Sequence, residues 1–445
     1  MKVGFISLGC SKNLVDTEMT IGLFKNNNFE IVNDVEKAEI IVINTCGFIE
    51  SAKQEAINTI LEMAEYKETG KCKYLIVMGC LVQRYKEELS KAIPEVDLFI
   101  TIDEYNVFWN KIEKLVGVAS QGESYEDNTN ICNELEYMNR VISTGNKTAY
   151  LKIAEGCSNR CTYCAIPYIR GPFESRKIED ILEEAKILAK TGIKELIIIA
   201  QDTTKYGIDI YGKPMLPELL EKLCKIEGIK WIRFLYSYPE TITDELLKVI
   251  KENKKICKYF DIPIQHISDS VLKRMNRKSN GQSIRKLIDK IRSEIPEAVI
   301  RTTLIVGFPG ETKENFEELY KFVKIYKFDK LGCFTYSKED GTPAARLKDQ
   351  IHYKTKEARL NKIMSIQKEI SKKSLEKNID KTFECLIEGK TFDNKYYVGR
   401  TYMDVPDIDG IVYIKNTKLA KVGDFVNVKI NKVSDYDLIG EIKEQ

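Results

Sequence analysis

Short apolar runs alternate with helical patterns along the first third of the chain. The strand-length apolar runs are Val3–Ser7, Glu39–Asn44 and Tyr74–Met78. In the segments after them, apolar residues recur every three or four positions, as on one face of a helix. These segments are Asn13–Lys25, Ile49–Ala64 and Gln83–Ala92. Because strands and helices in βαβαβ order favour a parallel, doubly wound sheet, we predict an α/β domain over residues 1–118.

A polar stretch with little periodicity, Ser120–Asn133, separates this domain from a second alternating region. We predict a linker over residues 119–142. The apolar runs beyond it are Tyr150–Ile153, Glu195–Ala200, Trp231–Tyr236, Tyr259–Ile262, Val299–Val306 and Gly332–Thr335. Helical patterns lie between them, and Ile178–Lys190 is the clearest. About six βα units indicate a partial (β/α)6 barrel, whose chemistry lies at the carboxyl ends of its strands.

The last part of the chain combines a long charged helix with short strand-like pieces. An apolar stripe along Lys354–Lys373 predicts that this helix packs on the partial barrel, which then spans residues 143–375. Segments that alternate apolar and polar residues follow, namely Thr382–Ile387, Tyr396–Tyr402, Gly410–Ile414 and Asp424–Val433. They predict a small antiparallel β-barrel over residues 376–445.

Composition decides how the cysteines are interpreted. The 445 residues include no apolar stretch long enough for a membrane helix and no signal peptide, so we expect a cytoplasmic protein without membrane contact. In that reducing compartment, the 12 cysteines are not expected to form disulfides, and grouped thiols indicate metal binding or catalysis. The 2 histidines leave little for a His-rich zinc site or a Ser-His-Asp triad. A net charge of +2 gives no overall argument for nucleic acid.

Three cysteines stand close together directly after the first strand of the predicted barrel. Cys157, Cys161 and Cys164 have C-x3-C-x2-C spacing, so three thiolates can hold one 4Fe–4S cluster and leave one iron open to a substrate. Gly156 would allow a tight turn there, and Tyr163 could cover the cluster. The alternatives are three buried structural thiols or part of a zinc site, for which no fourth ligand lies nearby.

With this spacing the chain resembles the radical S-adenosylmethionine superfamily. The resemblance implies a partial barrel that binds S-adenosylmethionine and cleaves it reductively to a 5′-deoxyadenosyl radical. It also implies cofactor contacts at strand ends and beside the cluster, for which the candidates are Tyr163, Gln201, Gln265 and Gly307. The alternative for these four residues is ordinary loop chemistry.

A second set of cysteines is spread over the first domain. Cys10, Cys46 and Cys80 each lie at or just past the carboxyl end of a predicted strand. Because such ends gather at one edge of a parallel sheet, the three thiols can converge on a second, auxiliary 4Fe–4S cluster. The alternative is that free cysteines occur there by chance. We interpret the remaining cysteines as small apolar residues; they are Cys72, Cys132, Cys224, Cys257, Cys333 and Cys385.

The three parts together resemble the methylthiotransferases, whose C-terminal barrel is a TRAM domain. The resemblance implies a radical cluster on the 157–164 triad and a sulfur-carrying cluster on the 10–80 triad. It also implies two uses of S-adenosylmethionine, as methyl donor and radical source, and a reductant protein such as flavodoxin or ferredoxin. An unactivated C–H bond has no useful acidity, so the chemistry rests on cofactors and not on general bases.

Two branches of this family differ in substrate. Segments such as Val3–Asp16, Asn44–Ile49 and Gln201–Thr204 resemble the branch that modifies the β-carbon of an aspartate in the small-subunit ribosomal protein uS12. From Asp380 to Gln445 there are 12 acidic and 10 basic residues, Asp404, Asp407 and Asp409 among them, which suits a basic protein better than a phosphate backbone. RNA binding is therefore not favoured.

Three alternative functions stay open at this point. The nearest is a transfer-RNA adenosine methylthiotransferase, which shares the mechanism. Another is a non-catalytic iron–sulfur electron carrier or scaffold, although carriers usually give each cluster four protein ligands. The third is a radical enzyme without sulfur insertion, which would need one cluster only.

Overall fold

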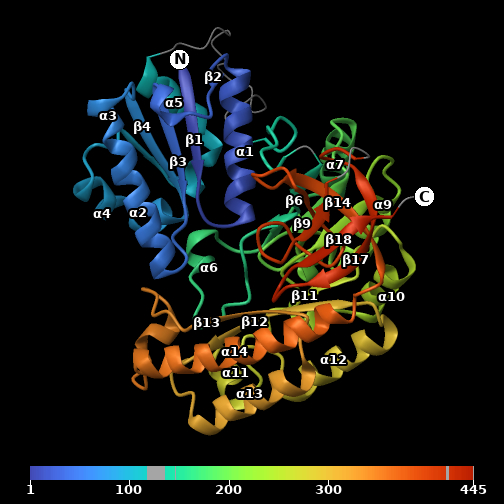
Figure 1. Ribbon diagram of the computed structural model, residues 1–445. Helices are drawn as coiled ribbons and strands as arrows, with labels where there is room; N and C mark the ends of the chain where they lie inside the picture. The colour runs from blue at the N-terminus through green and yellow to red at the C-terminus, as the bar shows by residue number, and fades with distance from the viewer. Residues whose placement is uncertain (118–135, 146, 417–419, 444–445) are drawn as a thin grey trace.

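The structure is a computed structural model that describes residues 1–117, 136–145, 147–416 and 420–443 (Figure 1). Three bodies follow one another along the chain: a parallel sheet with its helices, a larger partial barrel and a small closed barrel. The predicted linker segment Ser120–Asn133 and Cys132 lie outside the described residues. The boundaries at 118, 142 and 375 stay predictions.

The first body is a five-stranded parallel sheet in the order β2-β1-β3-β4-β5. Its strands are β1 (Lys2–Ser7), β2 (Glu30–Ile31), β3 (Ile40–Thr45), β4 (Tyr74–Gly79) and β5 (Leu98–Ile100). Its helices are α1 (Ser11–Asn26), α2 (Glu50–Ala64), α3 (Tyr66–Thr69), α4 (Cys80–Ala92) and α5 (Phe108–Val116). Apolar side chains of α2 and α4 cover one face and those of α1 and α5 the other, so the predicted doubly wound fold is confirmed.

The second body is a partial barrel of six parallel strands, as predicted. Two three-stranded sheets, β6-β9-β10 and β11-β12-β13, meet at the bridge between Ile232 and Ile256. The strands are β6 (Thr148–Lys152), β9 (Glu195–Ile199), β10 (Trp231–Phe234), β11 (Tyr259–Asp261), β12 (Val299–Val306) and β13 (Lys330–Thr335). A short antiparallel pair, β7 (Ala154–Glu155) and β8 (Glu174–Ser175), follows the first strand.

Helices cover the outer face of this barrel. They are α7 (Ile178–Lys190), α9 (Leu216–Cys224), α10 (Asp244–Glu252), α12 (Gly281–Glu294), α13 (Lys313–Tyr326) and α14 (Tyr353–Glu376). Shorter helices lie in the loops, namely α6 (Ile166–Ile169), α8 (Ile208–Tyr211) and α11 (Asp269–Arg274). Short 3-10 helices are η1 (Val35–Lys37), η2 (Ile102–Val107), η3 (Thr203–Lys205), η4 (Pro239–Thr241) and η5 (Pro343–Arg346). Helix α14 lies along β13, as its apolar stripe predicted.

The third body is a closed barrel in the order β14-β15-β16-β18-β17. Its strands are β14 (Thr382–Lys390), β15 (Tyr396–Arg400), β16 (Val412–Lys415), β17 (Phe425–Val433) and β18 (Leu438–Ile442). All pairs are antiparallel except β16 with β18, which is parallel. Strand β18 was absent from the prediction, and it is the strand that closes the barrel.

The C-terminal barrel packs on the face of the partial barrel that is turned away from its helices. Alternate residues of the barrel strands point in opposite directions, so Leu196 packs toward the helices and Ile197 toward the C-terminal barrel. One apolar core joins Tyr150, Ile197 and Trp231 to residues of β14, β16 and β17. The carboxyl ends of the partial-barrel strands are thus left to the N-terminal body.

Candidate metal and cofactor site

The three N-terminal cysteines lie on neighbouring loops at one edge of the first sheet. Strands β1, β3 and β4 are adjacent, and Cys10 and Cys80 stand at the starts of α1 and α4. Gly9 packs against Cys46, because a β-carbon at position 9 would lie 3.0 Å from the Cys46 sulfur. Gly47 packs in the same way on the backbone of the α4 start, because a β-carbon at position 47 would lie 2.7 Å from the Leu81 α-carbon. The predicted convergence at this edge therefore has a physical basis in loop packing.

The electrostatics of these thiols suit deprotonation by a metal. Burial, together with the neighbouring Cys80 and Cys10, raises the pKa of Cys46 to about 12. Burial also raises the pKa of Cys80, while the Arg170 guanidinium opposes that rise. Without metal both are thiols, and a bound iron would displace their protons.

The second triad lies in the loop between β7 and α6. Cys157 and Cys161 are buried and Cys164 is half-buried. Gly156 has φ +68°, and the Gly171 and Pro172 carbonyls leave no room for a β-carbon at this position, so the predicted tight turn is present. The Cys157 N–H donates to the Gly171 carbonyl (3.1 Å) and the Cys164 N–H to the Cys161 carbonyl (3.1 Å). Burial raises the pKa of Cys157 and Cys164 above the usual thiol value.

Two side chains that the sequence did not single out contact this triad. The Tyr238 hydroxyl lies 3.5 Å from the Cys161 sulfur, and an Arg277 N–H points to the same sulfur at 3.9 Å. The Arg277 guanidinium stacks over the Tyr238 ring at 4.2 Å. Tyr163 packs beside the apolar cluster that contains Phe308.

Polar atoms without partners gather at the carboxyl ends of β9, β10 and β11. The buried Gln201 Oε1, Ser237 Oγ and Gln265 Oε1 have no hydrogen-bond partner among the described residues. Buried polar atoms are normally hydrogen-bonded, so this cluster fits a polar ligand. The Gln201 amide nitrogen donates to Glu155 (2.8 Å). At Gly307, by contrast, Lys356 occupies the space beside the α-carbon, so packing already explains that glycine.

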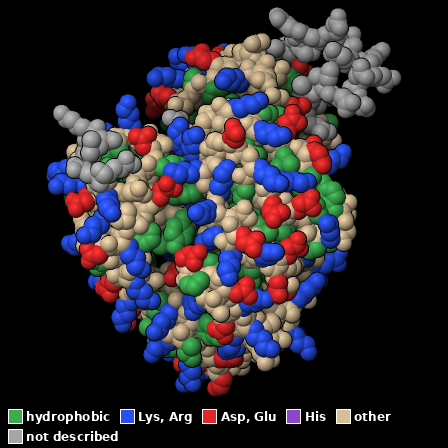
Figure 2. Space-filling model, turned by 90° about the vertical axis from the view of Figure 1, so that its right-hand side faces the viewer, with side chains coloured by type: hydrophobic (Ala, Val, Ile, Leu, Met, Phe, Trp, Pro, Cys, Tyr) green, Lys and Arg blue, Asp and Glu red, His purple; other side chains and the backbone are tan. Residues whose placement is uncertain are grey.

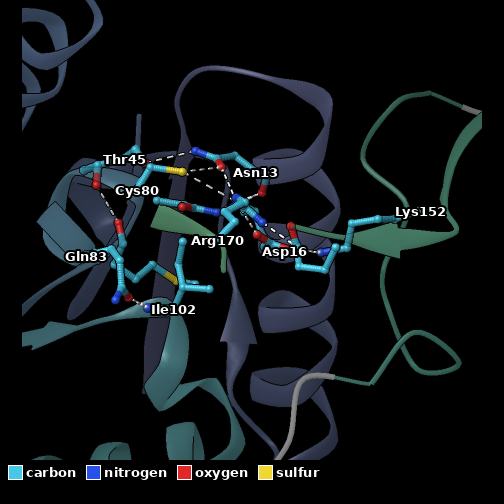
Figure 3. A network of polar contacts seen from close by, with 12 residues as sticks. Asn13, Asp16, Thr45, Cys80, Gln83, Ile102, Lys152 and Arg170 are labelled. Carbon is cyan, nitrogen blue, oxygen red and sulfur yellow. Dashed lines mark hydrogen bonds and ion pairs between the residues drawn. The ribbon is translucent and has the colours of Figure 1, made fainter. Parts of the chain in front are cut away.

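The two cysteine loops adjoin each other. Cys80 packs in one small apolar cluster with Ala165 and Ile169, which follow Cys164 in the chain. Arg170 continues the contact into a polar network that reaches Asp16 and Lys152 (Figure 3). The loops that carry the two triads are therefore in direct contact across the two bodies.

The donor set fits clusters better than a single ion. Among the described residues, no group of three or more His, Cys, Asp or Glu side chains is close enough to hold one metal ion. A four-iron cluster is wider than an ion and takes each thiolate on a different iron, so its ligands stand further apart. Each triad supplies three thiols, the donor type that such a cluster takes.

The sequence did not indicate the polar and charged residues that join the two triads. Asn13 and Asp16 are three positions apart on α1, so they share a face of that helix beside Cys10. Their spacing could have indicated a buried polar stripe. Arg170 gave no such signal, because its role depends on contacts between the two bodies.

Three family profiles match the chain. The radical SAM superfamily profile covers residues 151–323, the uncharacterized protein family UPF0004 residues 2–101 and the TRAM domain residues 379–442. The fold is similar to that of the radical S-adenosylmethionine methyltransferase TsrM from Kitasatospora setae, with TM-score 0.55 and 12% identity over 77% of this chain and 76% of that one. This likeness concerns the fold alone.

Curated relatives match over nearly the full length. The chain is 67% identical over 443 residues to the ribosomal protein uS12 methylthiotransferase RimO of Alkaliphilus oremlandii (strain OhILAs), covering 99% of both. It is 54% identical over 445 residues to the RimO of Acetivibrio thermocellus, covering 99% of this chain and 98% of the relative.

The partial barrel, its cysteine loop and the flanking bodies define a transferase that uses radical S-adenosylmethionine chemistry. Within that class, the chain belongs to the ribosomal protein uS12 methylthiotransferase (RimO) family. Membership implies S-adenosylmethionine and a 4Fe–4S cluster as cofactors. Of the helices in the described ranges, none has the length and hydrophobicity of a bilayer-spanning segment.

Proposed function

We propose that this chain replaces a hydrogen on the β-carbon of an aspartate in ribosomal protein uS12 with a methylthio group. The observation that carries the proposal is the contact between two cysteine loops, with Cys80 packed on the residues that follow Cys164. A reaction that generates a radical and then inserts sulfur needs both functions near one substrate carbon. The names of the full-length relatives support the same reaction and substrate.

We further propose which residues hold the cofactors. Cys157, Cys161 and Cys164 would hold the radical cluster, and Cys10, Cys46 and Cys80 the auxiliary cluster. When bound, the two 4Fe–4S clusters and S-adenosylmethionine would supply the electron, the sulfur and the methyl group.

We assign the remaining residues of the site to binding S-adenosylmethionine and enclosing the radical cluster. The oxygens of Gln201, Ser237 and Gln265, which have no partner among the described residues, would accept hydrogen bonds from S-adenosylmethionine. Arg277, whose N–H points to the Cys161 sulfur, and Tyr163 would cover the radical cluster. Gly307 is the weakest candidate for cofactor contact, since Lys356 fills the space beside it.

Two of the acidic residues that favoured a protein substrate in the C-terminal barrel are not free on its surface. Asp404 forms an ion pair with Lys330 (2.8 Å), and Asp409 accepts a hydrogen bond from the Tyr259 hydroxyl (2.6 Å). Both carboxylates therefore face the partial barrel and do not repel a phosphate backbone. Figure 2 views the molecule from the side of the C-terminal barrel, and basic and acidic side chains are interspersed there. The described residues of this face therefore give RNA no continuous basic stripe, which supports a protein substrate on this side.

The proposal includes the setting of the reaction. A substrate on the ribosome places the enzyme in the cytoplasm, and a flavodoxin or ferredoxin would deliver electrons. We also propose that the chain divides into residues 1–118 for the auxiliary cluster, a linker over 119–142, 143–375 for the radical barrel and 376–445 for the TRAM-like barrel.

Mass spectrometry of uS12 tests the proposal. The reconstituted enzyme, with reductant and S-adenosylmethionine, should add about 46 Da to one aspartate of uS12, the mass of a methylthio group that replaces hydrogen. Transfer RNA in a parallel reaction is the control for the alternative substrate. A methylthio mark on adenosine with unmodified uS12 would overturn the proposed substrate, and absence of 5′-deoxyadenosine would overturn the enzyme class.

A further inference from the structure

Arg170 is a buried cation at the contact between the two cysteine loops. Its side chain is 1% exposed. One terminal nitrogen donates to Asn13 Oδ1 (2.6 Å) and Asp16 Oδ2 (2.8 Å), and it lies 3.7 Å from the Cys80 sulfur. The other terminal nitrogen donates to Glu155 Oε2 (2.9 Å). In Figure 3 the guanidinium of Arg170 lies between Asn13, Cys80 and Asp16.

The carboxylate on the far side of Arg170 belongs to the radical loop. Glu155 comes directly before Gly156 and Cys157, and its Oε1 accepts from the Gly156 N–H (3.2 Å). The same oxygen accepts from the Gln201 amide (2.8 Å), which lies at the carboxyl end of β9. Through Glu155, one terminal nitrogen of Arg170 thus reaches the segment that carries the radical triad.

The charges of the network balance before any thiolate is counted. Lys152 forms ion pairs with Asp16 (2.5 Å) and Glu155 (2.8 Å), so two buried cations face two carboxylates. A thiolate at Cys80 would add a negative charge beside Arg170. A cation at that distance in a poorly solvated site stabilises negative charge more strongly than it would in water.

We propose that Arg170 is a positioning residue that holds the two cluster loops in register and supplies positive charge to the cluster on Cys80. The proposal rests on the proposed function, because it assumes that both triads hold clusters. The planar guanidinium of Arg170 can hold both loops, since it donates in two directions at fixed geometry, which a lysine cannot do.

A neighbouring arginine provides the matched control. Arg140 is also 1% exposed, and it joins α1 to the partial barrel through Glu18 (2.9 Å) and Glu184 (2.9 Å). None of the contacts described for Arg140 involves a cysteine. Loss of Arg140 therefore removes a comparable buried link between the bodies without removing charge from a cluster site.

The test compares Arg170→Gln, Arg170→Lys and Arg140→Gln in the reconstituted full chain. Two readouts are needed: the midpoint potential of each cluster from a redox titration followed by electron paramagnetic resonance, and the ratio of 5′-deoxyadenosine to methylthio product. Arg170→Gln should lower the potential of the auxiliary cluster only and raise the ratio. Arg170→Lys should restore the potential and leave the ratio high, while Arg140→Gln should leave both at the wild-type values.

Two results would overturn the proposal. One is an Arg170→Gln protein with wild-type potentials and ratio; the other, which decides the matter if that variant does not fold, is a wild-type ratio in Arg170→Lys. A wild-type protein that assembles a single cluster would instead overturn the two-cluster proposal itself, so the two failures are distinguishable.

Discussion

At the scale of single residues, buried charge joins the C-terminal barrel to the partial barrel. Arg400, 1% exposed, pairs with Glu195 at the start of β9 (2.6 Å) and with Glu388 of β14 (2.7 Å). Arg233 approaches Glu195 from the other side (3.1 Å). Burial would raise the pKa of Glu195, but Arg400 and Arg233 hold it below the usual value. The ion pairs therefore stabilise the junction only while Glu195 is ionised.

Replacing Arg400 should destabilise this junction strongly. Arg400→Met leaves Glu195 buried with one partner fewer, a change that costs about 3–5 kcal/mol in comparable pairs. Because the pKa of Glu195 is lowered on folding, the difference from the wild type should be full near neutral pH and shrink below about pH 4. Denaturant midpoints measured at several pH values check this.

Lys429→Met is the matched control for that variant. Its ion pair with Asp380 (3.1 Å) is solvent-exposed, so its loss should cost less than about 1 kcal/mol. Equal destabilisation by the two variants would show that burial of the Arg400 pair is unimportant.

At the scale of elements, the sequence predicted where helices and strands lie better than it predicted what surrounds them. All six barrel strands and helix α1 lie where their periodicity placed them. Yet α1 is also buried on its polar side, where Asp16 and Glu18 meet the partial barrel. Periodicity within one helix identifies a polar face, but whether that face meets water or buried charge depends on distant segments. The short strands β5 and β18 were missed because three to five residues give little pattern.

A second contact between elements holds the loop that carries Cys46. Glu339, on the loop after β13, accepts from the Glu50 N–H at the start of α2 (3.1 Å). It also pairs with Lys53 (3.2 Å) and with Arg84 (3.2 Å), which in turn donates to the Gly47 carbonyl (2.7 Å). The cysteine edge of the first sheet is thus joined to the partial barrel at Glu339 as well as at Arg170.

Glu339→Gln should loosen the loop around Cys46. It removes a charged acceptor, and hydrogen bonds to charged groups contribute about 1.5–3 kcal/mol, so amide exchange over residues 46–50 should accelerate at least about tenfold. Hydrogen–deuterium exchange followed by mass spectrometry measures this. Glu62→Gln, at an exposed position of α2, should leave that exchange unchanged, and equal protection in both variants would contradict the account.

At the scale of the whole molecule, the first sheet lies at one end of the partial barrel and the C-terminal barrel on one of its faces. The C-terminal barrel is joined to strand starts such as Glu195 and Lys330, and the cysteine edge of the first sheet meets the loop after β7. The rule for parallel strands predicts from the sequence that Cys10, Cys46 and Cys80 converge, and the close spacing of Cys157, Cys161 and Cys164 predicts the second triad. It does not predict that the two triads adjoin, because that depends on packing between bodies through Cys80, Ala165 and Ile169.

Iron content of the variant that lacks the first triad tests the central claim most directly. The wild-type chain should hold about eight irons, as two 4Fe–4S clusters require. After Cys10, Cys46 and Cys80 are all replaced by Ala, iron should fall by half and methylthio transfer should cease, while 5′-deoxyadenosine still forms. Unchanged iron in the triple variant would contradict the account.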